Sequence, residues 1–128
     1  MTKFVTYRRR PEQTMQIELV NTLRDIAPPL DFMCFHVPNG GYRTPREAAI
    51  FKALGVIPGI PDLVCLWSAG RVGFIELKAH NGALTNIQGR THAFLRGMGF
   101  EVAVVRSVEQ AIDTLKEWGA PIRGRIAA

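Results

Sequence analysis

Two carboxylates and a lysine stand at the ends of two neighbouring apolar segments. Asp62 begins the segment DLVCLW at 62–67, and Glu76 and Lys78 close the segment VGFIELK at 72–78. Both segments are rich in β-forming residues, and the short glycine-containing link between them is typical of a β-hairpin. Because strand side chains alternate between faces, Glu76 and Lys78 are expected on one side of the hairpin. Pairing of the two strands can then bring Asp62 beside Glu76.

Hydrolysis of a phosphodiester is the chemistry that suits this set. Mg²⁺ takes oxygen ligands and binds through one or two carboxylates together with substrate phosphate and water. Such a metal polarises the phosphoryl oxygen and activates a bound water, and a neighbouring lysine offsets the charge that develops in the transition state. The alternative is an ordinary pair of Glu76 and Lys78 on an exposed strand, which stabilises by about 0.2–1 kcal/mol. The full context favours catalysis, with Asp62, Glu76 and Lys78 at a Mg²⁺ or Mn²⁺ site.

Helices and strands alternate around this hairpin. Apolar residues at helical spacing predict a helix from Pro11 to Ile26, which the pair Pro28-Pro29 ends. Buried strands are expected at 32–37 and 100–105. Further helices are expected at 45–54, 85–98 and 107–118. The order α-β-α-β-β-α-β-α predicts an α/β protein with a mixed sheet flanked by helices. We divide the chain into a basic arm at 1–10, one domain at 11–120 and a tail at 121–128.

Length and composition limit the possible classes of protein. A chain of 128 residues with 47% hydrophobic and 21% charged residues fits one globular domain. Its formal net charge of +5 favours a polyanionic partner, although a generic basic protein gives the same charge. The two cysteines, Cys34 and Cys65, lie in apolar runs and are expected to be buried thiols. No membrane-spanning run, signal peptide, zinc-ligand spacing, P-loop or nucleophilic serine motif is present, so we expect a cytoplasmic protein without a membrane.

The motifs around the hairpin resemble the VRR-NUC family of the PD-(D/E)XK nuclease superfamily. The resemblance extends from about Phe35 to Val108 and rests on HVPNGG at 36–41, GVIPGIPDL at 55–63, ELK at 76–78, LTNIQ at 84–88 and GFEVAVV at 99–105. It implies a restriction-endonuclease-like single-domain core and a metal-dependent nuclease. Compact stand-alone chains of this family, from phages and bacteria, are associated with homodimers that cut four-way DNA junctions.

The same resemblance assigns roles to further residues. It implies that Glu18, on the first helix, and Leu77 join Asp62 and Glu76 around the metal, although Glu18 also reads as a solvated glutamate at the edge of the apolar face. Gln88 is implied in catalysis, while Thr85 and Gln88 also form the pattern of a helix capping box. Expected contacts with substrate are His36, Asn39, Arg43, His80, Asn81 and Arg90. For His36, a structural role competes with a catalytic one.

The expected function is a divalent-metal-dependent endonuclease for DNA, selective for four-way (Holliday) junctions and acting as a homodimer. A two-fold dimer can place the paired cuts that resolve a junction. One alternative is a nuclease for flaps, nicks or linear DNA, since the active-site residues do not encode substrate shape. Another is a non-catalytic nucleic-acid-binding module, for which two carboxylates facing a phosphate would have no use.

Overall fold

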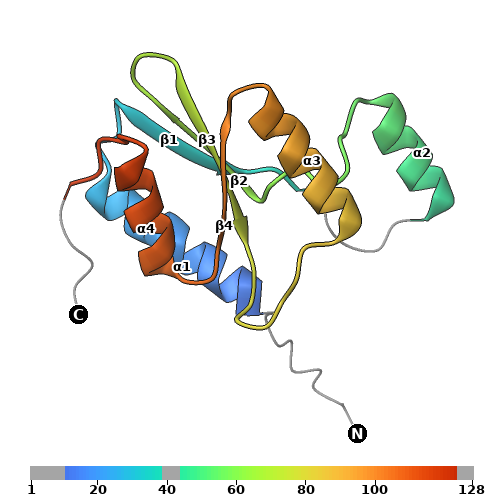
Figure 1. Cartoon of the computed structure of the whole chain (residues 1–128), viewed down its shortest axis with the longest axis horizontal. Helices are drawn as coiled ribbons and strands as arrows, with labels where there is room; N and C mark the ends of the chain where they lie inside the picture. The colour runs from blue at the N-terminus through green and yellow to red at the C-terminus, as the bar shows by residue number, and fades with distance from the viewer. Residues whose placement is uncertain (1–10, 39–43, 124–128) are drawn as a thin grey trace, which may run out of the picture.

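The computed structural model describes residues 11–38 and 44–123. In these residues helices and strands alternate along the chain (Figure 1), in the order α1 (Pro11–Ile26), β1 (Phe32–His36), α2 (Pro45–Ala53), β2 (Leu63–Trp67), β3 (Arg71–Leu77), α3 (Asn86–Gly97), β4 (Glu101–Val105) and α4 (Val108–Glu117). Each predicted element is therefore confirmed, with ends that differ from the prediction by at most one residue. None of the described helices is long and apolar enough to cross a bilayer.

The strands form one mixed sheet in the order β1-β2-β3-β4. β1 pairs with β2, and β2 with β3, in antiparallel fashion, whereas β3 and β4 are parallel. In the β2–β3 hairpin Leu63 lies opposite Ile75. The same register, continued by one residue, sets Asp62 opposite Glu76. The hairpin thus brings the two carboxylates side by side, as the sequence predicted.

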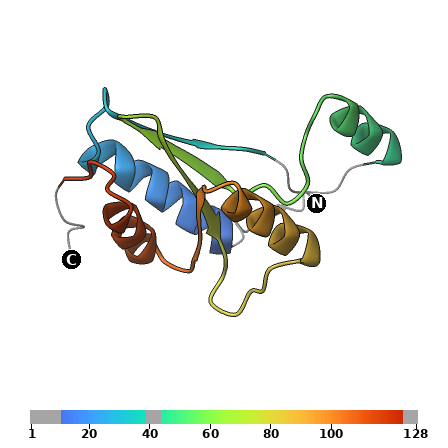
Figure 2. The ribbon, with the colours of Figure 1, turned by 45° about the horizontal axis from the view of Figure 1, so that its top comes forward.

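One face of the sheet carries the apolar core. Leu63, Ile75 and Leu77 point to this face and are at most 2% exposed. They pack with Leu19 of α1 and Leu115 of α4, which are both fully buried. Figures 1 and 2 show α1 and α4 together on one side of β4, with α3 on the other side. Because side chains alternate along β3, Glu76 points away from this core and towards α3.

Both cysteines are free thiols inside the protein, as predicted. Cys65 is buried and Cys34 is half-buried. They are opposite each other on β2 and β1, with their Sγ atoms 3.6 Å apart. Nothing in the described residues links either thiol to the residues of the hairpin end.

The two ends of the chain differ in how far the structure describes them. The predicted arm at 1–10 lies outside the described residues. Of the predicted tail, residues 121–123 are described: Ile122 packs against the core, and the Arg123 backbone N–H donates to the Ile26 carbonyl at 2.9 Å. The folded domain therefore includes the first residues of the segment that we set apart as a tail.

Candidate active site

Asp62 is held at the start of β2 by contacts with both neighbouring strands. Its Oδ2 accepts the Leu77 backbone N–H at 2.8 Å. Its carbonyl oxygen accepts the Val37 N–H at 3.1 Å and lies 2.7 Å from His36 Nδ1. Because a carbonyl can only accept, His36 donates from Nδ1 in this contact. Main chain and side chain of Asp62 are thus both fixed, and the carboxylate is oriented towards β3.

The loop before Asp62 rests on helix α3. The Thr91 hydroxyl donates to the Pro58 carbonyl at 2.7 Å. Gly59 has φ +78°, and a Cβ there would lie 2.7 Å from the Ile87 carbonyl oxygen. Only glycine permits both this left-handed backbone and this close approach. The glycine of the GIPDL motif therefore allows the loop to pack against α3, and this packing positions Asp62.

Glu76 is a buried carboxyl group in the middle of the sheet. It is 1% exposed, and its Oε1 has no hydrogen-bond partner. Burial, followed by the neighbouring Asp62 carboxylate, raises the pKa of Glu76 to about 9, while Lys78 opposes the rise. Without a further positive charge, Glu76 therefore keeps its proton at neutral pH.

Lys78 extends the line of β3 beyond its last residue. Its backbone N–H donates to the Val105 carbonyl at 3.0 Å, which continues the parallel pairing with β4. The residue is 8% exposed, and its ammonium group is near enough to Glu76 to lower the pKa of that carboxyl group. The predicted convergence of two carboxylates and an ammonium is thus what the geometry shows.

These donors fit a hard divalent cation. In the described part of the chain no three side chains of His, Cys, Asp or Glu form a group able to hold a metal. Mg²⁺, however, needs only one or two carboxylates because substrate phosphate and water complete its coordination. The unpartnered Oε1 of the buried Glu76 and the adjacent Asp62 carboxylate supply that minimum. A bound cation would also offset the repulsion that raises the pKa of Glu76.

Leu77 contributes to the site through its main chain alone. Its side chain is 2% exposed and belongs to the apolar core, and its N–H is donated to Asp62. A role as a metal ligand, which the family resemblance implies, would rest on its carbonyl oxygen.

Gln88 occupies the predicted capping box of α3. Thr85 Oγ1 accepts the Gln88 N–H at 3.1 Å, and Gln88 Oε1 accepts the Thr85 N–H at 3.0 Å. The residue is half-buried, and its side-chain oxygen is used to begin the helix. The capping role is confirmed, and the catalytic role stays a prediction.

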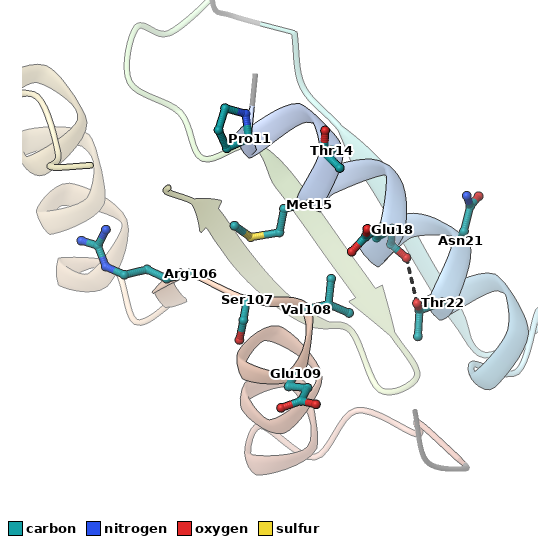
Figure 3. Close-up of a pocket in the computed structure, with 10 residues that line it drawn as sticks. All are labelled: Pro11, Thr14, Met15, Glu18, Asn21, Thr22, Arg106, Ser107, Val108 and Glu109. Atoms are coloured by element: carbon teal, nitrogen blue, oxygen red, sulfur yellow. Dashed lines mark hydrogen bonds between the residues drawn. The ribbon is translucent and has the colours of Figure 1, made fainter. Parts of the chain in front are cut away.

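Glu18 is in a different part of the molecule from the paired carboxylates. It is exposed on α1 and lines a pocket of about 910 Å³ between α1 and the start of α4 (Figure 3). Its neighbour Leu19 points into the core on the face of the sheet opposite to that of Glu76. The structure therefore does not bring Glu18 together with Asp62 and Glu76.

The other predicted substrate contacts are at the surface or outside the described residues. His36 is exposed and adjoins Asp62, as described above. His80 and Asn81 are exposed in the turn after β3, and Arg90 is exposed on α3. Asn39 and Arg43 fall in the segment 39–43, which the structure does not describe.

Two residues that the sequence did not single out hold the turn that follows Lys78. Glu12, in the first turn of α1, accepts the Ala79 N–H through Oε1 at 3.3 Å. Arg106 donates from Nη1 to the carbonyl oxygens of Ala79 and Gly82, at 2.7 and 2.6 Å. An acidic residue in the first turn is common in helices, so Glu12 carried no distinct signal. Among the described glutamates of α1, Glu12 is the one bonded to the end of the E-x-K segment.

A third unexpected residue is His92 of α3. It is fully buried, and its Nε2 lies 3.5 Å from Glu76 Oε1. In the sequence it follows Gln88 by four residues, which places both on one face of the helix. This four-residue spacing is the feature of the sequence that could have pointed to His92.

Comparisons with known proteins agree with this arrangement. Residues 12–109 match the sequence pattern of the VRR-NUC domain. A solved structure described as a VRR_NUC domain protein matches with a TM-score of 0.67 and 22% identity, over 88% of this chain and 90% of that one. Another, described as a VRR_NUC domain, has a TM-score of 0.57 and 24% identity, over 85% and 97%.

Identities of this size establish a shared fold, and the expected restriction-endonuclease-like core of mixed sheet and flanking helices is confirmed. None of the proteins with curated functions matches the chain. The sequence match covers most of the described chain, including both strands of the site. The chain belongs to the VRR-NUC domain family, and is thus a nuclease domain with a nucleic-acid substrate.

Proposed function

We propose that the protein is a divalent-metal-dependent endonuclease that hydrolyses DNA phosphodiester bonds at Asp62, Glu76 and Lys78. The observation that carries the proposal is the placement of two carboxylates and an ammonium group at one end of the β2–β3 hairpin, with the Glu76 oxygen buried and unpartnered. Burial of such a pair is unfavourable unless a positive charge compensates it. The presence of this buried pair in a nuclease domain supports a role in binding a cation.

Asp62 and Glu76 are the residues that would hold Mg²⁺ or Mn²⁺. When bound, the cation supplies Lewis-acid polarisation of the phosphoryl group and an activated water. Asp62 is prepared for this task because the Leu77 N–H already fixes its carboxylate. Glu76 is prepared by burial, which excludes competing water from its Oε1.

Lys78 stabilises negative charge on the reacting phosphate. Its position beside Glu76 places the ammonium group on the same side of the sheet as the carboxylates. In a buried site such a charge interacts with the transition state more strongly than it would in water. The side chains of His36, His80, Asn81 and Arg90 are proposed to contact substrate, and Gln88 is proposed to act in catalysis.

The proposed substrate is a four-way DNA junction, cut by a homodimer. The net charge of +5 supports binding to the phosphate backbone, without information on its shape. The symmetry of paired cuts supports a two-fold dimer. Gel filtration with light scattering at the concentrations of the assay tests the dimer. A monomer with activity proportional to protein concentration would rule out the resolvase version.

The central experiment compares a labelled four-way junction with a linear duplex of the same sequence. Each is incubated with EDTA, Mg²⁺ or Mn²⁺ and with the wild type, Glu76→Ala or Glu101→Gln. Glu101 is an exposed glutamate at the start of β4 and serves as the matched control. Thermal unfolding of each variant verifies that it is folded.

Three results would distinguish the possible functions. Metal-dependent cleavage of the junction alone, abolished in Glu76→Ala and retained in Glu101→Gln, supports the full proposal. Equal cutting of both substrates retains the nuclease and removes junction selectivity. Salt-sensitive binding without cleavage in any metal, by folded protein, points to a non-catalytic module and overturns the proposal.

A further inference from the structure

Two buried polar groups face each other beneath helix α3. His92 is 0% exposed, and neither of its ring nitrogens has a hydrogen-bond partner. Its Nε2 is 3.5 Å from Oε1 of Glu76, which is also buried and without a partner. The imidazole therefore lies directly against the carboxylate that we propose to hold the metal.

Such a pair is too unfavourable to be incidental. An unsatisfied buried polar group costs about 1–3 kcal/mol, and most buried polar groups in proteins have a partner. A separation of 3.5 Å exceeds the ordinary hydrogen-bond distance of about 2.7–3.2 Å, but contacts at catalytic groups often tighten only in the working complex. A small rotation of either side chain would pair Oε1 of Glu76 with Nε2 of His92.

The ring nitrogen nearest to Glu76 is the one that can donate to it. An imidazole nitrogen that faces an acceptor carries a proton. Facing Oε1 of Glu76 at 3.5 Å, that nitrogen is Nε2.

The fold also fixes where the ring can be. His92 directly follows Thr91, whose hydroxyl binds the Pro58 carbonyl, and Gly59 packs closely on the same helix. The loop that positions Asp62 is therefore the loop that anchors α3 above Glu76. The contact between this loop and α3 therefore sets the positions of both carboxylates relative to the imidazole.

We propose that His92 is a positioning residue, which donates its Nε2–H to Oε1 of Glu76 and holds that carboxylate in one orientation for the cation. This inference rests on the proposed metal-dependent function and assigns a role that the E-x-K motif does not contain. A histidine that orients a ligating carboxylate acts on metal affinity because the ligand is then ordered before the cation binds.

The test compares His92→Leu with His92→Gln. Leucine fills the buried space without a donor, whereas glutamine can place an N–H near the position of Nε2. Mn²⁺ binding by isothermal titration calorimetry is expected to weaken about 10- to 100-fold in His92→Leu and by less than about threefold in His92→Gln. Urea unfolding of each variant is measured alongside, and His92→Leu is expected to stay folded because an apolar side chain suits a position that is 0% exposed.

A second measurement does not depend on the metal. The ¹⁵N NMR spectrum of the metal-free wild type is expected to show a proton on Nε2 of His92. An Nε2 without a proton, equal Mn²⁺ affinity in His92→Leu and wild type, or equal losses in both variants would overturn the proposal. If the wild type binds no Mn²⁺, the proposed function fails, and the proton on Nε2 still decides whether His92 donates to Glu76.

Discussion

The two faces of strand β3 have opposite properties although their residues alternate along one chain. Ile75 and Leu77 point into a core of apolar side chains from α1, α4 and the neighbouring strands. Between them, Glu76 points the other way, towards His92 on α3. The apolar face gains free energy from burial, whereas the other face buries charged and polar groups at a cost. One strand therefore joins a stabilising face to a face that is organised for chemistry.

This difference explains how the protein can bury charged and polar groups at the site. The carboxyl pair is carried by the backbone of the sheet, and the imidazole is carried by α3. The apolar core on the opposite face stabilises that backbone. Stability and chemistry are consequently expected to respond to different substitutions, even at adjacent positions.

Truncation on the apolar face should produce the largest loss of stability. Ile75→Ala is expected to lower the free energy of unfolding by about 2–5 kcal/mol, because it leaves a cavity where the side chain is 0% exposed. Urea denaturation measures this change. Met33→Ala, at a site that is 60% exposed on β1, is the control and should change stability by less than about 0.5 kcal/mol. A loss below about 1 kcal/mol for Ile75→Ala would contradict the division between the faces.

Removal of the ammonium group on the other face should affect chemistry and spare stability. Lys78→Met is expected to reduce metal-dependent cleavage about 10²- to 10³-fold, because a preorganised charge at the reacting phosphate is lost. In saturating Mg²⁺, where the cation compensates the carboxylates, the unfolding midpoint should stay close to that of the wild type, since methionine suits a site that is 8% exposed. Lys52→Met, on the exposed α2, is the matched control. Cleavage by Lys78→Met at the rate of the Lys52 variant would remove Lys78 from the mechanism.

The metal-free protein should lose stability as pH rises. The pKa of Glu76 is raised from 4.5 to about 9, so between these values the folded state holds a proton that the unfolded state has released. The free energy of unfolding then falls with increasing pH, by at most about 1.4 kcal/mol per pH unit. Measurements above pH 7 avoid the titration of unfolded histidine at about 6.5.

The neutral variant Glu76→Gln separates this effect from the rest of the protein. It should flatten the dependence of unfolding on pH in EDTA, because glutamine has no proton to release. Saturating Mg²⁺ should also flatten it for the wild type, since the cation favours the ionised carboxylate. An unchanged slope in Glu76→Gln would show that another group is responsible.

The smallest effect is expected from Glu18. Because it is exposed and on the opposite side of the sheet from Glu76, Glu18→Gln should change the cleavage rate by less than about twofold. Glu12→Met is the informative comparison, since it removes the oxygen that accepts the Ala79 N–H, and a loss of about two- to tenfold corresponds to one hydrogen bond. Steady-state cleavage of the junction measures both. A larger loss for Glu18→Gln would restore Glu18 to the metal site.

The sequence predicted most of the fold because its signals are local. Pro11 and the pair Pro28-Pro29 bound α1, and the Thr85–Gln88 box begins α3 as expected. Alternation along 72–78 placed Glu76 and Lys78 on one side, and the turn at 68–71 fixed the pairing that brings Asp62 opposite Glu76. These features depend on period, turn chemistry and capping, which are properties of neighbouring residues.

Contacts between distant segments were beyond such reasoning. Whether Glu12 or Glu18 lies near the end of β3 depends on how α1 crosses the sheet. The sequence shows only that both glutamates belong to one helix. Arg106, the residue that follows β4, contacts the turn at 79–82 that follows β3. Neither the Glu12 contact nor the Arg106 contact can be predicted from neighbouring residues in the sequence. Both contacts follow from packing angles and from the parallel pairing of β3 with β4.

The sequence by itself determined the chemistry: the residue types and their alternation in the hairpin specify two carboxylates and a lysine, and the motifs around them specify the family. Only the tertiary structure decided how that chemistry is supported. The docking of α3 through Gly59 and Thr91 buries His92 against Glu76 and isolates the carboxylate from solvent. The reason is physical: side-chain identity fixes which groups can react, whereas burial and mutual distance, which set their pKa and their partners, exist only after distant segments have packed.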